Sequence, residues 1–164
     1  MAIKTLEDLF IYELSDIYSA EKQLTKALPR LARAATNPDL VAAFETHLEE
    51  TNGQIERIDQ VVETLGIRLK RIKCAAMEGL VEEGKEVIDS VEKGPVRDAA
   101  LIGGAQKVEH YEIASYGTIA ALAKQLGYKD ALPLLLETLE EEKVTDEKLT
   151  MIAKAGAKEA AAAG

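Results

Sequence analysis

Apolar residues recur at steps of three and four along most of this chain, and this spacing restricts the fold more than any other feature. Residues at such steps lie on one face of an α-helix. No stretch shows the two-residue alternation expected of a half-buried strand. Aromatic residues make up only 4% of the chain and tryptophan is absent, a composition that favours helices over strands. The sequence therefore predicts an all-α protein.

Four long segments carry this spacing, and turn signals separate them. The segments span residues 5–35, 38–65, 102–126 and 132–153. Thr5, Asn37 and Asp130 are predicted N-caps, and Gly66 and Gly127 are predicted to end the second and third helices. Short turns join the first helix to the second and the third to the fourth, so each pair should form an antiparallel hairpin.

Residues 66–95 connect the two hairpins. This segment is basic at first and then shows a short amphipathic pattern, which predicts a crossover with one short helix. Such a connection can carry the chain back across a bundle. We expect residues 1–164 to form a single domain, with a low-complexity tail at 155–164 that frays.

The charge balance and the cysteine count exclude several classes of function. The chain has 20 basic and 29 acidic residues, a net charge of −9, so we expect neither nucleic acid nor a membrane as partner. Cys74 is the only cysteine, which excludes a disulfide framework and a multi-cysteine metal site. No apolar run approaches the roughly 20 residues that cross a bilayer. We expect a cytoplasmic protein.

Acidic residues interrupt the apolar faces of three predicted helices. They stand at Glu21, Glu109, Glu112, Glu142 and Asp146, and Glu50 lies on the inner side of the second helix, one turn after His47. A carboxylate taken out of water without a partner costs several kcal/mol, roughly speaking. The sequence offers few cations on these faces, so the acids require another compensating charge.

The positions of these acids along the chain place them at one level of the bundle. Residues equidistant from a tight turn lie side by side in an antiparallel hairpin. The midpoint of Glu21 and Glu50 falls at the first turn, near residue 36, and that of Glu112 and Glu142 falls at Gly127. Glu109 and Asp146 are also equidistant from this second turn. The acids are therefore expected to converge on one point.

Two metal ions are the simplest compensation for so many carboxylates, and we predict a dinuclear centre. Oxygen-rich ligation without thiolate suits iron, with manganese as the alternative. Glu50 and Glu142 are predicted as bridging ligands and Glu21 and Glu112 as terminal ones. The further predicted ligands are Glu109, Asp146 and His47, and Gln54, Tyr18 and Tyr116 are predicted to lie beside the ligands.

The runs YSAEKQL, HLEETNGQIERID, GAQKVEHYEIASYG and ETLEEEKVTDEKL resemble the YciE/YciF family of ferritin-like bacterial stress-response proteins. The wider pattern is similar to rubrerythrin, whose helices supply one Glu, then E-x-x-H, E-x-x-E and E-x-x-x-H. Gly53 and Asp146 stand where this pattern has its histidines. The resemblance implies a ferritin-like four-helix bundle with a long helical crossover between helices 2 and 3, a homodimer and a link to stress.

Two functions remain open at this stage. In the first, the metal ions react with oxygen or peroxide or handle iron, as in a di-iron oxidase or peroxidase, and an external electron donor supplies the reductant. In the second, the protein is a non-catalytic stress protein in which the metal site only stabilises the bundle and the surface recruits a partner. Iron storage in a cage would require an assembly far larger than a dimer.

Overall fold

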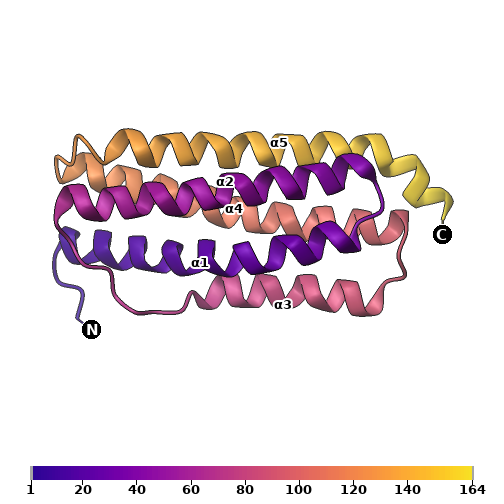
Figure 1. Ribbon diagram of the computed structural model, residues 1–164, viewed down its shortest axis with the longest axis horizontal. Coiled ribbons are helices and arrows are strands. Elements are labelled where there is room, and N and C mark those ends of the chain that lie inside the picture. The colour runs from indigo at the N-terminus through magenta and orange to yellow at the C-terminus, as the bar shows by residue number, and fades with distance from the viewer. Residues whose placement is uncertain (1, 164) are drawn as a thin grey trace.

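The computed structural model describes residues 2–163, and this part of the chain contains five helices and no strand. The helices are α1 (Leu6–Ala34), α2 (Pro38–Leu65), α3 (Ala75–Ser90), α4 (Pro95–Gln125) and α5 (Leu132–Ala162). In Figure 1, α1, α2, α4 and α5 run along the length of the molecule, and α3 lies along the outside of this group, against α1 and α4. The predicted four-helix bundle with an added crossover helix is confirmed.

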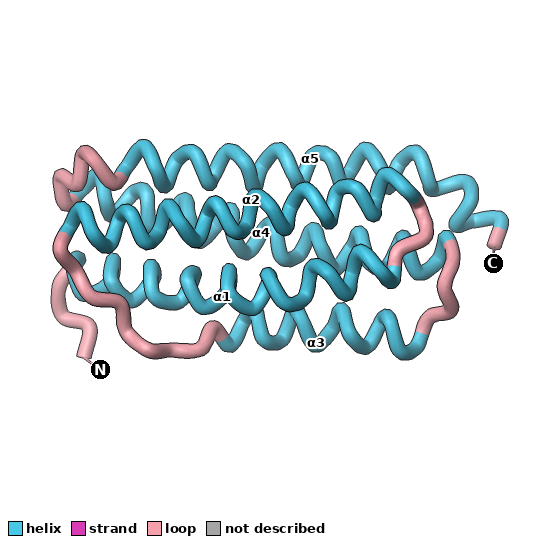
Figure 2. The backbone as a smooth tube through the Cα atoms, in the orientation of Figure 1, coloured by secondary structure: helices cyan, strands magenta, loops and turns pink. Residues whose placement is uncertain are grey.

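Neighbouring helices of the bundle are antiparallel. The most extensive packing joins α1 to α2 and α4 to α5, and contacts of α2 with α5 and of α1 with α4 close the bundle. The colour ramp of Figure 1 shows that α1 and α5 run in one direction and α2 and α4 in the other. The chain must therefore return along the bundle between α2 and α4, and the crossover makes this return (Figure 2).

Three polar side chains of α1 fix the first part of the crossover. Ser15 Oγ accepts a hydrogen bond from the amide of Lys70, and Ser19 Oγ accepts one from the amide of Cys74, both at 2.9 Å. Gln23 Nε2 donates to the carbonyl of Cys74 at 3.1 Å. These residues lie at four-residue steps and so share one face of α1. They satisfy backbone groups that an extended segment would otherwise leave unpaired.

Most helix ends follow the capping signals. Thr5 and Asp8 form a capping box, with both hydrogen bonds at 3.0 Å. Asn37 accepts a hydrogen bond from the amide of residue 39 at 2.9 Å. Gly66 and Gly127 adopt positive φ angles of 63° and 74°, the left-handed conformation that glycine provides at little cost. The predicted ends of these helices are confirmed.

Two helix starts differ from expectation. Asp130 was expected to cap the last helix, but Ala131 occupies the N-cap, and no side chain in the described structure caps it. Pro133 has no N–H group, so one of the amides that an Asp130 cap would bind is missing. The third long helix begins at Pro95, well before Ile102, where its apolar pattern starts. Proline at the first helical position needs no apolar neighbour to begin a helix.

The last helix extends further than its apolar pattern. Residues 155–162 are helical and mostly exposed. Gly156 and Ala160 line a cavity of about 80 Å³ together with Pro95 and Ile102 of α4. This segment therefore extends α5 alongside the start of α4, and its expected fraying stays a prediction.

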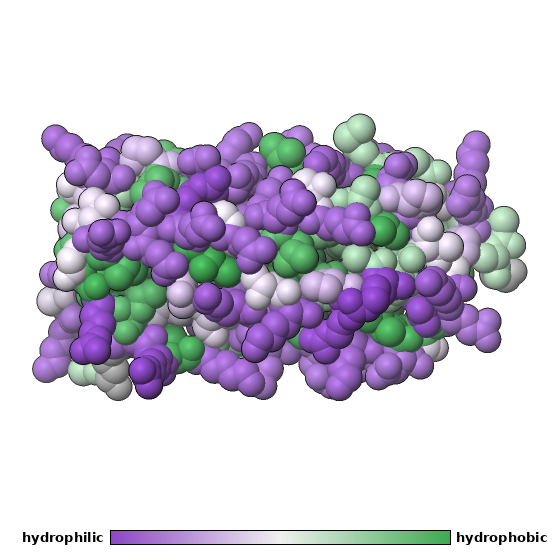
Figure 3. Space-filling view, in the orientation of Figure 1, coloured by the Kyte–Doolittle hydropathy of each residue, from purple (hydrophilic) through white to green (hydrophobic). Residues whose placement is uncertain are grey.

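The core of the bundle is apolar except around its middle. Its fully buried apolar side chains include Phe10, Leu14, Ile17, Leu24, Leu40, Ile58, Ile119, Leu135 and Leu149. Between them lie buried polar groups, which the next section describes. The face of the molecule in Figure 3 is mainly hydrophilic with scattered apolar areas. Within residues 2–163, no helix combines the length and the apolar character required to cross a membrane.

Candidate metal centre

Four buried side chains from three helices converge inside the bundle. His47 of α2, Glu109 and Glu112 of α4, and Glu142 of α5 each contribute a potential ligand atom, and these atoms lie within 4.8 Å of one another. His47 Nε2 lies 2.9 Å from Glu109 Oε1, 3.9 Å from Glu142 Oε2 and 4.0 Å from Glu112 Oε2. None of the four side chains is more than 4% exposed. We call this group the acid cluster.

Helix geometry explains how the acid cluster forms. Glu109 and Glu112 are three residues apart, so both point from the same face of α4. The turn at Gly127 places Glu142 opposite this face, as the equal separations along the chain predicted. His47 enters from α2, which packs on α5. The structure therefore brings these four of the predicted ligands together.

Most oxygens of the acid cluster have no partner. Both carboxylate oxygens of Glu112 and Glu142, and Oε2 of Glu109, are buried and find no hydrogen-bond partner among the described residues. Such groups are rare in folded proteins because burial removes their hydrogen bonds to water without replacement. A cation between them would supply the missing interaction. Carboxylates with a single imidazole are ligands that iron and manganese accept.

Burial and the closeness of the carboxylates also shift the pKa values of the acid cluster. Burial raises the pKa of Glu112. Burial also raises the pKa of Glu142, and the carboxylates of Glu112 and Glu109 raise it further. Burial alone would lower the pKa of His47, but the carboxylates of Glu109 and Glu50 outweigh this effect and raise the pKa to about 9. Without a metal ion, protons therefore compensate the charge of this cluster.

Glu21 belongs to the same class of buried, unpaired acids. It lies on α1, is fully buried, and neither of its carboxylate oxygens finds a partner within residues 2–163. It stands outside the group of four whose ligand atoms lie together. Its burial agrees with the prediction that it faces the core.

The structure places Glu50 behind His47. Glu50 Oε2 lies 3.5 Å from Nδ1 of His47 and accepts a hydrogen bond from Thr145 Oγ1 at 3.2 Å. The His47 ring lowers the pKa of Glu50. A carboxylate on the outer nitrogen of a histidine fixes the orientation of its ring. The geometry thus suits Glu50 to orienting His47, whereas the sequence predicted a bridging ligand.

Asp146 turns to other partners. Its Oδ1 accepts a hydrogen bond from Gln106 Nε2 at 3.3 Å, and its Oδ2 lies 3.2 Å from Nε2 of His110. The side chain of His110 is 71% exposed, so this pair lies at the rim of the molecule. The structure does not bring Asp146 into the acid cluster.

The three residues predicted to lie beside the ligands have different surroundings. Tyr116 is fully buried, and burial together with the nearby Glu112 and Glu142 raises the pKa of its hydroxyl. Gln54 is also fully buried and donates from Nε2 to Glu141 Oε1 at 3.2 Å. Tyr18 instead lines a surface groove, with Nζ of Lys22 5.2 Å from its ring centroid. Tyr116 is therefore within electrostatic range of the acid cluster.

Sequence reasoning missed a second layer of contacts around the acid cluster. Arg57 binds both oxygens of Glu141, at 2.6 Å and 2.9 Å, and also donates to Thr138. Thr145 lies three residues after Glu142, and its hydroxyl holds Glu50. The spacing of Arg57 from Gln54 and of Thr145 from Glu142 is the signal that could have identified them.

Four antiparallel helices around buried carboxylates and one imidazole define the class of ferritin-like helical bundles. The chain belongs to the DUF892 family, described as a domain of unknown function, whose family model matches residues 5–162. It is 68% identical over 154 residues to Protein YciF of Escherichia coli strain K12, covering 93% of each chain. The predicted resemblance to this family is confirmed.

Two solved structures support the same relationship. The crystal structure of the E. coli stress protein YciF matches with a TM-score of 0.93 and 66% identity, covering 95% of this chain and 99% of that one. YcfI of Rhodopseudomonas palustris, described provisionally as a structural protein, matches with a TM-score of 0.86 and 48% identity. That match covers 90% of this chain and 94% of YcfI.

Proposed function

We propose that this chain is a stress-response protein whose acid cluster binds two iron or manganese ions that react with oxygen or peroxide. The observation that carries the proposal is the set of buried carboxylate oxygens on Glu112, Glu142 and Glu109 that lack partners among the described residues. A stress-related role is supported by the similarity to the E. coli stress protein YciF.

Each residue has a definite part in this proposal. His47, Glu109, Glu112 and Glu142 would hold the ions, and the unpaired Glu21 would complete the carboxylate set. Glu50 would keep the His47 ring turned toward the ions. Two bound iron or manganese ions would supply electron transfer to oxygen or peroxide, which protein side chains alone do not provide. We place this activity in the cytoplasm.

A purely structural role is the second candidate, and one observation favours it. The raised pKa values of Glu112, Glu142 and His47 allow the acid cluster to hold protons, which lets the bundle fold without metal. The provisional description of the relative YcfI as a structural protein agrees with this role. Bound metal would then stabilise the fold without turnover.

Oxidant consumption and thermal stability, measured on the same samples, separate the two candidates. Protein loaded anaerobically with iron(II) is mixed with oxygen or with peroxide, and oxidant consumption is followed beside the melting temperature. The comparison uses Glu112→Gln and an exposed control on α5, Glu140→Gln. The proposal predicts repeated oxidant consumption with an external reductant, lost in Glu112→Gln alone. Metal-dependent melting without oxidant consumption would establish the structural role.

The homodimer implied by the family resemblance and the external electron donor that turnover would require stay predictions. Sedimentation equilibrium tests the first, because a dimer has twice the 17.8 kDa mass of the chain.

A further inference from the structure

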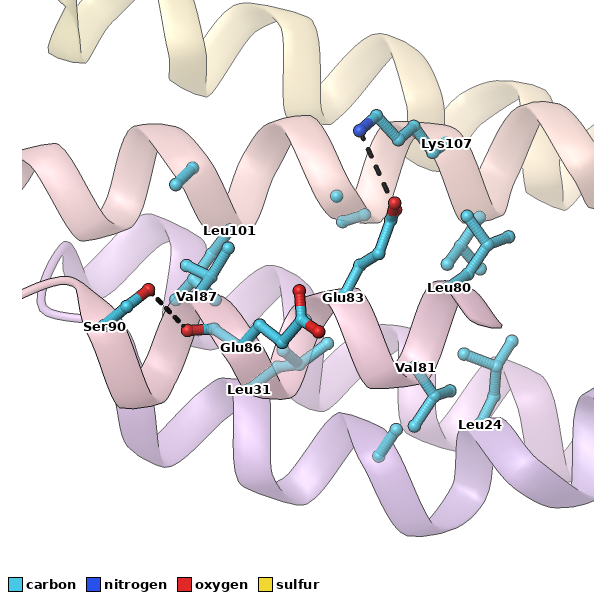
Figure 4. A pocket seen from close by; sticks show the side chains of 16 residues that line it. Leu24, Leu31, Leu80, Val81, Glu83, Glu86, Val87, Ser90, Leu101 and Lys107 are labelled. Carbon is cyan, nitrogen blue, oxygen red and sulfur yellow. Dashed lines mark hydrogen bonds and ion pairs between the residues drawn. The ribbon is translucent and has the colours of Figure 1, made fainter. Parts of the chain in front are cut away.

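Two adjacent cavities lie between the surface and the acid cluster, and they share part of their lining. The outer cavity, of about 310 Å³, lies between α3 and the helices α1 and α4. Figure 4 shows Val87 of α3 and Leu101 of α4 at one end of it and Leu80 of α3 toward the other end, with Glu83 and Lys107 paired between α3 and α4. The ion pair joins Glu83 Oε2 to Lys107 Nζ at 3.9 Å, and both side chains are exposed. The outer cavity therefore borders the solvent.

The inner cavity reaches the acid cluster. Its volume is about 20 Å³, and His47 and Glu109 form part of its wall. Leu24, Leu31, Ala105 and Val108 line both the inner and the outer cavity. One layer of side chains thus separates the two spaces. Movement of these side chains would connect the outer cavity, which borders the solvent, to His47 and Glu109 of the acid cluster.

The surface that the wall exposes to the inner cavity is almost entirely apolar, although three polar residues contribute to the wall. Besides the shared residues it contains Leu28, Ala43, Phe44 and Leu149, with Thr145 as a further polar residue. A cavity of this size has room for about one small molecule, since one probe sphere takes about 10–15 Å³. Water requires two to four hydrogen-bond partners, roughly, and an apolar wall does not provide them. An apolar diatomic molecule needs none.

We propose that these two cavities form the access route by which dioxygen reaches the His47 and Glu109 side of the acid cluster. The proposal rests on the proposed function and names its oxidant as dioxygen rather than peroxide, because peroxide carries hydrogen-bonding groups that the apolar surface of the inner cavity leaves unpaired. Ala105 occupies the junction between the cavities. Its short side chain keeps the separating layer thin.

Dissolved oxygen itself is the probe for the first test, carried out on metal-free protein. Oxygen is paramagnetic and speeds the nuclear relaxation of methyl groups that it approaches. We expect the methyl groups of Leu24 and Leu149, under oxygen pressure, to relax at least twofold faster than the equally buried methyl groups of Leu14. Equal relaxation at these positions would overturn the proposal.

Substitution at the junction provides the second test. Ala105→Leu should fill the layer between the cavities and cut oxygen-induced relaxation at Leu149 by at least half, while that of Leu80 in the outer cavity persists. Ala105→Val replaces it if the larger side chain prevents folding. Ala153→Leu is the matched control, because Ala153 lines the separate cavity beside the start of α4. Unchanged relaxation at Leu149 in a folded Ala105 variant would contradict the route.

Loaded protein separates a failure of the route from a failure of the proposed function. With iron bound at the wild-type level, Ala105→Leu should slow the reaction with dioxygen at least tenfold, and Ala153→Leu should not. A wild-type rate in Ala105→Leu would overturn the route while leaving the metal centre intact. A wild-type chain that binds no metal would contradict the proposed function, and the relaxation measurements would still decide the route.

Discussion

Glu142 is the residue at which function and stability conflict most directly. Both of its carboxylate oxygens are buried without a partner among the described residues, and burial raises its pKa. A buried polar group without a hydrogen-bond partner costs about 1–3 kcal/mol, and an apolar side chain of similar volume does not carry this cost. We therefore expect Glu142→Met to raise the free energy of unfolding of the metal-free protein by about 1–3 kcal/mol. Urea denaturation with chelator measures this.

The same variant should lose the stabilisation that metal gives the wild type. Glu140→Met is the control, because Glu140 is exposed on the same helix. A metal-free Glu142→Met protein that is less stable than the wild type would show that the carboxylate supports the fold, contrary to our account.

Gly53 offers a stabilising change that leaves the acid cluster's ligands in place. It lies inside α2, where glycine is less favourable than alanine by about 0.8–1.0 kcal/mol. Apart from its chain neighbours and the nearby backbone of α2, a Cβ atom at this position would meet no atom of the described residues within 4 Å. We expect Gly53→Ala to raise the free energy of unfolding by about 1 kcal/mol, visible as a higher melting temperature. A lower one would mean that this position is closed to side chains.

At the residue scale the sequence predicted which side chains are buried better than it predicted their partners. Periodicity and distance from the turn were sufficient for Glu109, Glu112 and Glu142, since helix geometry alone sets their direction. Glu50 and Asp146 differ because Thr145 and His110 offer them hydrogen bonds nearby. Choices between such partners depend on ångström-scale distances that periodicity does not contain.

The turn between α1 and α2 depends on a side chain from α4. Asp98 accepts hydrogen bonds from the amides of Thr36 and Asn37, at 2.8 Å and 2.9 Å, and is 8% exposed. Its removal would leave two partly buried amides unpaired, which costs about 1–3 kcal/mol. We expect Asp98→Ala to lower the free energy of unfolding by this amount in urea denaturation. Asp39→Ala is the control, because the Asp39 side chain is exposed in the first turn of α2.

Unchanged stability in Asp98→Ala would mean that solvent satisfies both amides equally well.

The contact of Asp98 with this turn also explains why the sequence misplaced the start of α4. Asp98 in the first turn of α4 makes polar contacts with the loop between α1 and α2. No apolar pattern therefore marks this part of the helix. The middle parts of the helices were predictable from the sequence because their apolar faces are long. The start of α4 was not predictable, since it is marked only by the specific hydrogen bonds that Asp98 accepts.

Across the whole molecule, the pH dependence of stability follows from the protons that the metal-free cluster holds. The pKa of His47 rises from 6.5 to about 9 on folding, so its stabilising contribution is complete below pH 6.5 and lost as the pH rises through 9. Glu112 and Glu142 also have raised pKa values, so the folded state holds more protons than the unfolded one above pH 4.5. Both effects make the free energy of unfolding fall as the pH rises.

We therefore expect the melting temperature of metal-free protein to decrease between pH 6.5 and 9 in scanning calorimetry with chelator. Metal-saturated protein should lose this dependence or reverse it, because bound ions displace the same protons. A metal-free melting temperature that rises over this range would contradict the assignment of raised pKa values to the acid cluster.

The global arrangement was accessible from the sequence because few topologies fit it. Two short turns require two antiparallel hairpins, and a long connection requires a return along the bundle. The sequence did not predict that Ser15 and Ser19 accept hydrogen bonds from the crossover and that Gln23 donates one to it, since polar residues on a helix face carry no distinct signal. Nor does periodicity predict cavities, which arise where side chains of several helices fail to fill the space between them.

Metal content per chain is the most direct test of whether the acid cluster binds two metal ions. Protein is purified without chelator, saturated with iron(II) or manganese(II) under anaerobic conditions, desalted and measured by elemental analysis. The variants Glu112→Gln and Glu142→Gln are measured beside the control Glu140→Gln. We expect about two metal ions per chain in the wild type and the control, and a loss of metal in both cluster variants. A wild-type chain without metal, or cluster variants that retain it in full, would contradict the proposed metal centre.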